Sequence, residues 1–254
     1  MNDRQGPLVV LVPSLGTAAR VWEGPAAALR ARRPDAQVVH VELPGHGSGR
    51  RSTEFAVRDV AAALIGEVEP IRAGRPVFVA GVSMGGAVAL EAATAAPDRV
   101  AGVGMFDSAT RFGTADGWAG LIARVEDAGL GGLRDGSAEG WFSPGFREQH
   151  PGEVEAFLDD LDTIDPASYL ACCRALARYD GSDALASLRA PLLAVVGAGD
   201  RGPTPDQVQA LAASVPGARY EVLEPAGHLS VVEHPDATAS LLLDLIGRAE
   251  GRTS

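Results

Sequence analysis

Residues 77–86 read VFVAGVSMGG, and this stretch decides the fold of the chain. Its first part, Val77–Ala80, is a short apolar run that predicts a buried strand. A Gly-x-Ser-x-Gly turn centred on Ser83 follows, and a helical pattern opens at Met84. A serine on such a sharp turn projects its hydroxyl above the sheet, at a helix N-terminus that favours developing negative charge. We therefore predict that Ser83 is a nucleophile.

Apolar runs elsewhere alternate with longer amphipathic stretches. This alternation is typical of parallel strands joined by crossover helices, and the continuous apolar character predicts strands buried on both faces. The other predicted strands are Leu8–Val12, Gln37–Val41, Val100–Phe106, Leu192–Val196 and Arg219–Leu223. The predicted helices of this pattern are Arg20–Arg32, Ala56–Ile71, Met84–Ala96, Thr204–Val215 and Pro235–Ala249.

One region breaks the alternation, from about Thr110 to Ala186. It contains helical stretches, most clearly Trp118–Ala128, Glu153–Ile164 and Ala167–Arg178, and no convincing strand. An all-helical insertion between the fourth and fifth strands predicts a cap over the carboxyl edge of the sheet, where ligands bind in open α/β sheets. We expect a core domain of residues 1–109 and 187–254, and a helical cap of residues 110–186.

The composition excludes several classes of partner. The 254 residues include 22 basic and 33 acidic ones, a net charge of −11, which argues against binding to nucleic acid or an anionic membrane. The apolar run at Leu8–Val12 is too short to span a bilayer, and no signal-peptide pattern precedes it. We therefore expect a soluble, cytoplasmic protein. Its only cysteines, Cys172 and Cys173, are adjacent, so they predict free packing thiols rather than a disulfide framework or a metal site.

A serine nucleophile needs a base, and the base needs an acid to orient it. His228 follows the last predicted strand and fits the base on chain order. His46 is the main competitor, although its turn suits a role in shaping the loop after the second strand. The remaining histidines are less suitable, because His40 lies within a predicted strand while His150 and His234 each precede a proline.

Two aspartates are candidates for the acid. Asp200 closes the turn Gly-Ala-Gly-Asp after the fifth predicted strand, and Asp107 follows the fourth. Both strand ends face the same edge and both aspartates satisfy the order Ser, Asp, His, so chain order does not separate them. The glycine-rich turn favours Asp200.

The tetrahedral intermediate of acyl transfer needs two backbone donors for its oxyanion. The N–H of Met84, directly after the nucleophile, is the first predicted donor. We expect the second in the loop after the first strand, residues 13–17, at the N–H of Leu15. The alternative interpretation of this loop is a plain strand-to-helix connection.

Together these features predict an α/β-hydrolase fold, with a mostly parallel sheet of about six strands flanked by helices and an all-helical cap insertion. Several segments also resemble the 3-oxoadipate (β-ketoadipate) enol-lactonases of aromatic-compound degradation. The similar stretches in the core are SLGT at 14–17, GHG at 45–47, SMGG at 83–86 and AGHLS at 226–230; those in the cap are WFSPGFR at 141–147 and YLACCRAL at 169–176.

The chain departs from that family in two places. Only seven residues precede the strand at Leu8, whereas the family has two further antiparallel N-terminal strands, which are missing here. Residues 41–45, VELPG, also replace the family's Asp-x-Arg-Gly turn. Without the leading strands, Gln37–Val41 is expected at a sheet edge. Another segment or a partner subunit in a homo-oligomer would cover that edge, unless the chain start is truncated.

The resemblance implies that the chain opens a small carboxylated lactone through an acyl-enzyme intermediate, with no metal or organic cofactor. A buried substrate carboxylate needs a cation. Arg147, beside Trp141 in the sequence, is the candidate, and both residues are predicted to bind substrate. Their alternatives are a solvated surface arginine and an ordinary cap-core tryptophan.

Three other functions stay open. A carboxylesterase or a carbon–carbon bond hydrolase of the same fold would use the same Ser83, Asp200 and His228. A non-catalytic receptor with this fold is a more remote alternative, since such proteins often lose one of the three residues.

Overall fold

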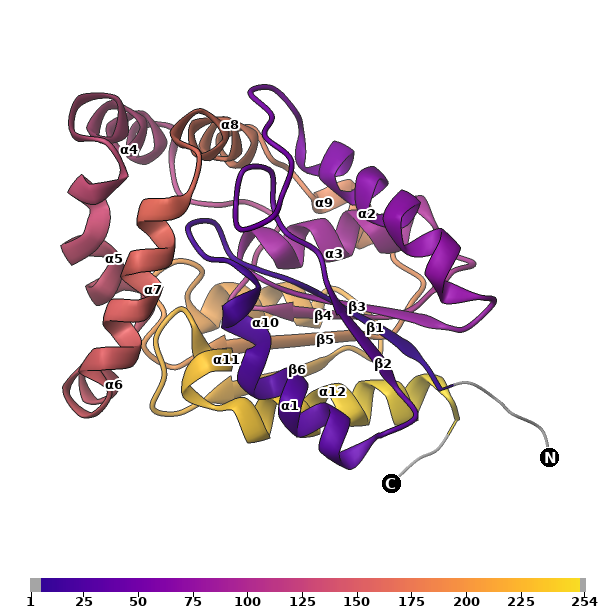
Figure 1. The fold of residues 1–254 in the computed structure, drawn as a ribbon. Coiled ribbons are helices and arrows are strands. Elements are labelled where there is room, and N and C mark those ends of the chain that lie inside the picture. Colours follow the sequence, from indigo (N-terminus) through magenta and orange to yellow (C-terminus); the bar gives the residue numbers. More distant parts are fainter. Residues whose placement is uncertain (1–5, 252–254) are drawn as a thin grey trace.

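The computed structural model describes residues 6–251, and its centre is one sheet of six parallel strands in the order β2-β1-β3-β4-β5-β6 (Figure 1). The strands are β1 (Leu8–Val12), β2 (Gln37–His40), β3 (Val77–Val82), β4 (Val100–Phe106), β5 (Leu192–Gly197) and β6 (Arg219–Leu223). All six predicted strands are confirmed, and β3 continues two residues beyond its predicted end. The predicted α/β class and parallel pairing are also correct.

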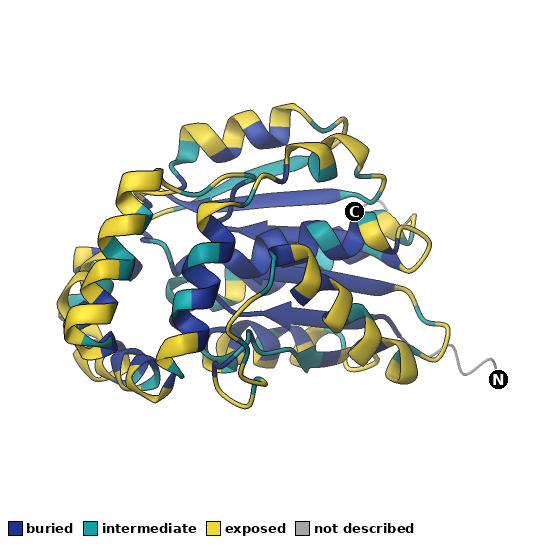
Figure 2. Cartoon of the chain, turned by 90° about the horizontal axis from the view of Figure 1, so that it is seen from above, coloured by how far each residue is buried: buried dark blue, intermediate teal, exposed yellow. Residues whose placement is uncertain are grey.

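Helices cover both faces of the sheet. Along β1, Val9 and Leu11 belong to the apolar cluster under α1 and α12, while Leu8 and Val10 belong to the cluster under α2, α3 and α10. This alternation follows from the two-residue period of a strand, and it buries β1 on both faces. Figure 2 shows most of the sheet in the dark blue of buried residues. The core helices are α1 (Glu23–Arg32), α2 (Val57–Arg72), α3 (Met84–Ala95), α10 (Pro205–Ala213), α11 (Ser230–Glu233) and α12 (Pro235–Ala249), with a 3₁₀ turn at Ala19–Trp22 before α1.

The segment between β4 and β5, residues 107–191, is described throughout and contains helices but no strand. Figure 1 shows α4 to α8 beside the carboxyl ends of the strands. The helices of this segment are α4 (Ala115–Ala128), α5 (Arg134–Trp141), α6 (Pro144–Gln149), α7 (Pro151–Thr163), α8 (Pro166–Ala177) and α9 (Ser182–Ser187), with a 3₁₀ turn at Leu130–Leu133. The three clearest predicted helices are present, and α5, α6 and α9 were not predicted.

The two ends of this helical segment lie together. The N–H of Gly181 donates to the carbonyl oxygen of Thr110 at 2.9 Å, and Arg111 is ion-paired with Asp180 next to this bond. The chain therefore leaves the sheet and returns to it at one place.

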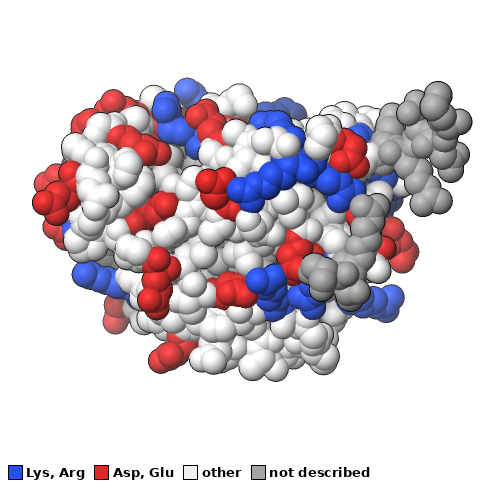
Figure 3. Space-filling view, turned by 90° about the horizontal axis from the view of Figure 1, so that it is seen from below, with Lys and Arg blue, Asp and Glu red and all other residues white. Residues whose placement is uncertain are grey.

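Other expectations of the sequence can be placed in the fold. Strand β2 lies at the sheet edge, as predicted, and pairs only with β1 within residues 6–251. Cys172 and Cys173 on α8 are buried free thiols. In the described part of the chain, no helix is long and apolar enough to cross a membrane. Figure 3 shows acidic side chains beside arginines on one face, in keeping with ion pairs such as Arg32–Asp236.

Candidate active site

Ser83 occupies a strained turn between β3 and α3. Its backbone has φ 54° and ψ −116°, a conformation rare for residues other than glycine, and its N–H donates to the carbonyl oxygen of Phe106 at 2.8 Å. A Cβ on Gly81 would lie 2.0 Å from the carbonyl carbon of Gly85, and one on Gly85 would lie 2.4 Å from the carbonyl oxygen of Val12. The two glycines therefore let α3 approach β3 and β1 closely enough to form the turn.

His228 and Asp200 form a hydrogen-bonded pair. Nδ1 of His228 lies 2.8 Å from Oδ2 of Asp200, and the Gly202 N–H donates to the other carboxylate oxygen at 3.0 Å. A proton on Nδ1 is donated to Asp200, which leaves Nε2 available as a proton acceptor. Burial lowers the pKa of His228, but the charge and hydrogen bond of Asp200, together with the charge of Asp107, raise it to a value above the ordinary one.

Asp107, the rival acid, is engaged elsewhere. It is fully buried, its Oδ1 accepts from the Gly197 N–H at 2.8 Å, and its Oδ2 accepts from the Ser230 hydroxyl at 2.6 Å. Burial and the nearby charge of Asp200 raise the pKa of Asp107 above its ordinary value. Asp107 thus joins the end of β4 to the segments that carry Asp200 and His228.

The structure does not bring Ser83 into hydrogen-bond contact with His228. Within residues 6–251 the Ser83 hydroxyl has no hydrogen-bond partner, although its carbonyl oxygen accepts from Ser108 Oγ at 2.7 Å. Hydrogen bonds between nucleophile and base are often long without substrate and tighten when it binds. The Ser83–His228 bond therefore remains a prediction for the substrate complex.

The two predicted oxyanion donors are both available. Neither the Leu15 N–H nor the Met84 N–H has a hydrogen-bond partner in the described part of the chain. The loop carrying Leu15 is fixed on either side, because the Ser14 N–H donates to Thr17 Oγ1 at 3.1 Å and the Thr17 N–H donates to the Ser14 carbonyl at 3.1 Å.

His46, the competing base, supports this loop instead. Its Nε2 accepts from the Gly16 N–H at 3.1 Å, and its Nδ1 lies 2.9 Å from the carbonyl oxygen of Pro44, to which it donates. The ring is fully buried, and burial lowers the pKa of His46 to about 4. A neutral imidazole held at both nitrogens fits a structural role beside the Leu15 loop.

A cavity of about 550 Å³ opens beside the His228–Asp200 pair. Its volume is typical of a site for a small molecule. Trp141, predicted to bind substrate, lines it, whereas Arg147 does not. The Nε of Arg147 is buried without a hydrogen-bond partner among the described residues. Neither Ser83 nor Met84 contributes to the lining.

Four polar residues of this cavity were missed by the sequence analysis. They are Arg124 on α4, Ser137 on α5, Tyr169 on α8 and Arg201, directly after Asp200. The adjacency of Arg201 to Asp200 was a usable signal. The side of α4 that faces the cavity could not be predicted from the sequence, because it depends on how the helices between β4 and β5 pack.

The helical segment between β4 and β5 contacts the base loop directly. The carbonyl oxygen of Trp141 accepts from the Leu229 N–H at 2.8 Å, and the Glu233 carboxylate accepts from the Gly227 N–H at 2.7 Å and the Ser143 N–H at 3.0 Å. The two neighbours of His228 are thus bound to this segment, Leu229 directly and Gly227 through Glu233 of α11. Glu233 is a further residue that the sequence analysis missed.

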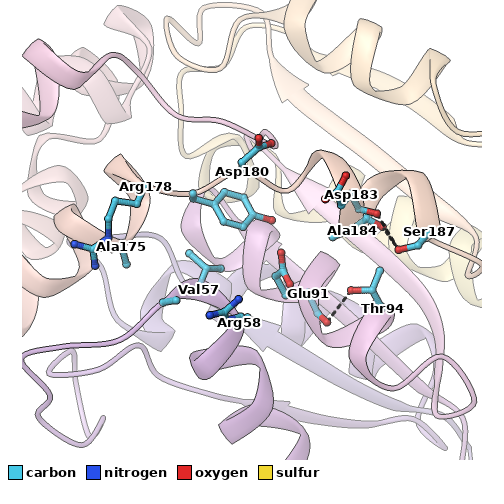
Figure 4. Close-up of a pocket in the computed structure, with 12 residues that line it drawn as sticks. Val57, Arg58, Glu91, Thr94, Ala175, Arg178, Asp180, Asp183, Ala184 and Ser187 are labelled. Atoms are coloured by element: carbon cyan, nitrogen blue, oxygen red, sulfur yellow. Dashed lines mark hydrogen bonds between the residues drawn. The ribbon is translucent and has the colours of Figure 1, made fainter.

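A second cavity, of about 390 Å³, lies among α2, α3, α8 and α9 (Figure 4). Glu91 and Thr94 line it, and Thr94 donates to the Glu91 carbonyl oxygen, one of the bonds drawn in Figure 4. None of Ser83, Asp200 and His228 contributes to this cavity. Within the described residues, no three His, Cys, Asp or Glu side chains are grouped as a metal ion would require.

Comparison with known proteins shows the family of the chain. A family model described as the alpha/beta hydrolase family matches residues 9–241. The chain is similar to 3-oxoadipate enol-lactonase 2 of Acinetobacter baylyi, with 29% identity over 91% of this chain and 85% of the relative. It is also similar to the pimeloyl-[acyl-carrier protein] methyl ester esterase of Methylococcus capsulatus, with 30% identity over 95% of both chains.

A solved structure has a closely similar fold. The crystal structure of the enol-lactonase from Burkholderia xenovorans superposes with a TM-score of 0.88 and 26% identity, covering 97% of this chain and 93% of that one.

Proposed function

Because this chain belongs to the alpha/beta hydrolase family and is a hydrolase of carboxylic esters, we propose that it opens a small carboxylated lactone of the 3-oxoadipate enol-lactone type. In this proposal Ser83 is the nucleophile, His228 the base and Asp200 the acid that orients it. The N–H groups of Leu15 and Met84 bind the oxyanion. The division into a core of residues 1–109 and 187–254 and a cap of residues 110–186 belongs to the same proposal.

One observation carries the assignment of base and acid. The 2.8 Å hydrogen bond between His228 Nδ1 and Asp200 fixes the imidazole with Nε2 free, beside a cavity of about 550 Å³. Asp107 has both of its oxygens bound elsewhere, which supports Asp200 as the acid. The strained backbone at Ser83 also supports the nucleophile, because a sharp turn of this kind projects the serine hydroxyl from the end of the strand.

In the first half of the reaction, His228 takes the proton of Ser83 as Oγ attacks the lactone carbonyl carbon. The negative charge that develops on the carbonyl oxygen is stabilised by the two N–H groups, which need no reorganisation because the Leu15 loop is already held by its own hydrogen bonds. The ring C–O bond then breaks, and His228 returns the proton to the leaving oxygen. The leaving group stays attached as part of the acyl-enzyme.

In the second half, His228 removes a proton from water as the water attacks the acyl carbonyl carbon. The bond between that carbon and Oγ of Ser83 then breaks, and His228 returns the proton to Oγ, which releases the acid. The released enol tautomerises to a ketone, which makes the opening difficult to reverse. The carboxylate of Asp200 stabilises the imidazolium that forms twice in the cycle.

The lactone is supported by two relatives named as 3-oxoadipate enol-lactonases, at 29% and 27% identity over most of the chain. A carboxylesterase is the main alternative, since a relative at 30% identity is named as a methyl ester esterase. A carbon–carbon bond hydrolase would share the same three residues. All three reactions need the same acyl-transfer chemistry, so substrate assays decide between them.

The decisive experiment compares three substrates on the wild-type protein: 3-oxoadipate enol-lactone, followed by ultraviolet absorbance, p-nitrophenyl acetate, and a methyl ester carried on an acyl-carrier protein. We expect the lactone to have the highest kcat/KM. An inert lactone beside rapid turnover of either ester would overturn the lactonase proposal and leave the ester hydrolase.

A second experiment tests the nucleophile. Ser83→Ala is expected to abolish turnover of every substrate and to prevent covalent labelling by a fluorophosphonate, which mass spectrometry should locate on Ser83 in the wild type. Thermal unfolding of the variant is the control for its fold. Undiminished turnover by a folded Ser83→Ala protein would contradict the assignment and favour a different mechanism.

A further inference from the structure

The arginines of this chain differ in whether a carboxylate neutralises them. All 22 basic residues are arginines, and they face 33 acidic residues. Ten of the arginines in the described part of the chain have a carboxylate oxygen within 4.0 Å. Arg124 and Arg201, which line the cavity beside His228, are not among them and have no hydrogen-bond partner in residues 6–251.

The lining of the cavity offers these two arginines no counter-charge of its own. Asp200 is the one carboxylate among the lining residues, and its side chain is only 2% exposed. One of its oxygens is bound to His228 and the other to the Gly202 N–H. Asp200 therefore forms no ion pair with Arg201, although the two are adjacent in sequence.

The charge of Arg124 reaches the interior of the cavity. Burial raises the pKa of Tyr169, and the guanidinium of Arg124 acts in the opposite direction on the same hydroxyl. Tyr169 is itself one of the residues that line the cavity. The lining of the cavity thus includes two guanidinium groups that have no hydrogen-bond or ion-pair partner among the described residues.

We propose that Arg124 and Arg201 bind a carboxylate of the substrate, so that the site selects acyl compounds with an anionic group away from the scissile ester. This inference rests on the proposed ester hydrolysis and names the specificity residues of the same site. Arg201 follows the strand β5, and Arg124 belongs to the helix α4 of the proposed cap. The substrate carboxylate would therefore bind one arginine of the core and one of the cap. Guanidinium groups suit this task because their planar donors match the two oxygens of a carboxylate.

The two arginines also explain how a protein with a net negative charge can bind an anionic substrate. Residues 110–186 contain six arginines against 14 aspartates and glutamates, so this segment carries most of the net charge of −11. An anion approaching such a surface is repelled at long range, but the repulsion is screened over about 8–10 Å by physiological salt. Two unpaired guanidinium groups at the cavity reverse the local field where the substrate binds.

The test uses a matched pair of chromogenic esters: p-nitrophenyl hydrogen glutarate, which is anionic, and its neutral methyl ester of the same length. For Arg124→Gln with Arg201→Gln, KM for the anionic ester should rise roughly 10- to 100-fold, the effect of losing charged hydrogen bonds, with kcat changed less than about 3-fold. KM for the neutral ester should rise much less. Arg189→Gln, an exposed arginine without an ion-pair partner among the described residues, is the matched control and should leave both esters unchanged.

Two results would overturn the inference. One is an unchanged ratio of anionic to neutral kcat/KM in the double variant. The other is an Arg147→Gln variant that alone reproduces the expected rise in KM, because this would assign the carboxylate to the cation predicted from the sequence.

A binding measurement separates this inference from the hydrolase proposal. Glutarate has no ester to cleave, and calorimetry should detect its binding to Ser83→Ala and a loss of at least 10-fold in affinity when both arginines are replaced. If no ester is turned over but glutarate still depends on Arg124 and Arg201, the proposed function fails and the carboxylate site stands. If esters are turned over but the affinity for glutarate does not change when both arginines are replaced, the carboxylate site fails and the proposed function stands.

Discussion

Asp107 and Asp200 follow adjacent strands, yet their carboxylates meet different partners. Asp200 holds His228, whereas Asp107 holds a backbone N–H and the Ser230 hydroxyl. Chain order did not distinguish them, because both precede His228 and both follow the carboxyl end of a strand. The distinction lies in which carboxylate reaches the imidazole, and that depends on the turn after β5.

The two aspartates should therefore respond differently to the same change. Asp200→Asn is expected to lower kcat roughly 10⁴-fold, because an amide donor favours the wrong histidine tautomer. Asp107→Asn should cost much less activity, since its carbonyl can still accept from Gly197 and the Ser230 hydroxyl can rotate to accept. Steady-state kinetics on both variants tests this. A larger loss for Asp107→Asn than for Asp200→Asn would exchange their roles.

The pH dependence follows from His228. In the proposed mechanism only the neutral imidazole of His228 acts as the base, and the pKa of His228 is raised above its ordinary 6.5. We therefore expect kcat/KM to rise with pH, with a midpoint above 6.5, and to be lost as the imidazole is protonated below it. A profile of kcat/KM between pH 5 and 9 gives this midpoint. A midpoint below 6.5 would contradict the effect of the two neighbouring carboxylates.

At the scale of elements, close approach of backbones defines the nucleophile turn. A Cβ on Gly85 would lie 2.4 Å from the carbonyl oxygen of Val12, and neither backbone can move without disturbing α3 or β1. Gly85→Ala should destabilise the protein by at least about 1–3 kcal/mol, the range for overpacked cores, and reduce activity with it.

Gly66 supplies the matched control. It is exposed within α2, and a Cβ there would meet nothing within 4 Å. Gly66→Ala should stabilise the protein by about 0.5–1 kcal/mol through helix propensity. Urea unfolding of both variants measures the two effects. Equal stability of Gly85→Ala and wild type would mean that β1 and α3 are less tightly packed than their contacts indicate.

The elements differed in how well the sequence predicted them. Strands β1, β4 and β6 were predicted to the residue, because short apolar runs bounded by turns are a strong signal for buried parallel strands. Helices α5 and α6 were missed, since α5 (RDGSAEGW) contains two glycines and little apolar periodicity and α6 has only six residues. Their ends depend on tertiary contacts, such as the bond between Ser143 and Glu233.

The dependence on tertiary packing also limited how many residues of the candidate site could be predicted from the sequence. Ser83 and His228 could be chosen because a strand end places a side chain at a known edge of the sheet. Arg124 could not, because a residue on a cap helix faces the cavity only through the packing of that helix. Arg147, which the sequence favoured, does not line the cavity beside His228.

At the scale of the whole molecule, His46 links stability to pH. Its pKa falls from 6.5 in the unfolded chain to about 4 in the folded one, so between these values the unfolded state binds the additional proton. Stability is therefore lost as pH falls through this window, by up to roughly 1.4 kcal/mol per pH unit. His46→Gln removes the titration.

The measurement compares the free energy of unfolding at pH 7.0 and pH 5.5, where most carboxylates are still ionised. The variant should lose about 1 kcal/mol less than the wild type between these values. His228 acts in the opposite direction, because its raised pKa stabilises the folded protein at low pH, but it does so in both proteins. The same pH slope in both would show that His46 titrates normally in the folded chain.

The bond between Thr110 and Gly181 has a consequence for how such proteins diversify. Because the two ends of the helical segment meet at 2.9 Å, the segment can be lengthened, shortened or exchanged without changing the distance that the sheet must bridge. Ser83, Asp200 and His228 all lie outside these ends. A lineage can therefore exchange the helical part of its substrate pocket by recombination at two points that are neighbours in space, while it keeps these three residues. In the laboratory, Thr110 and Gly181 are natural crossover points for grafting the helical segment of one hydrolase onto another.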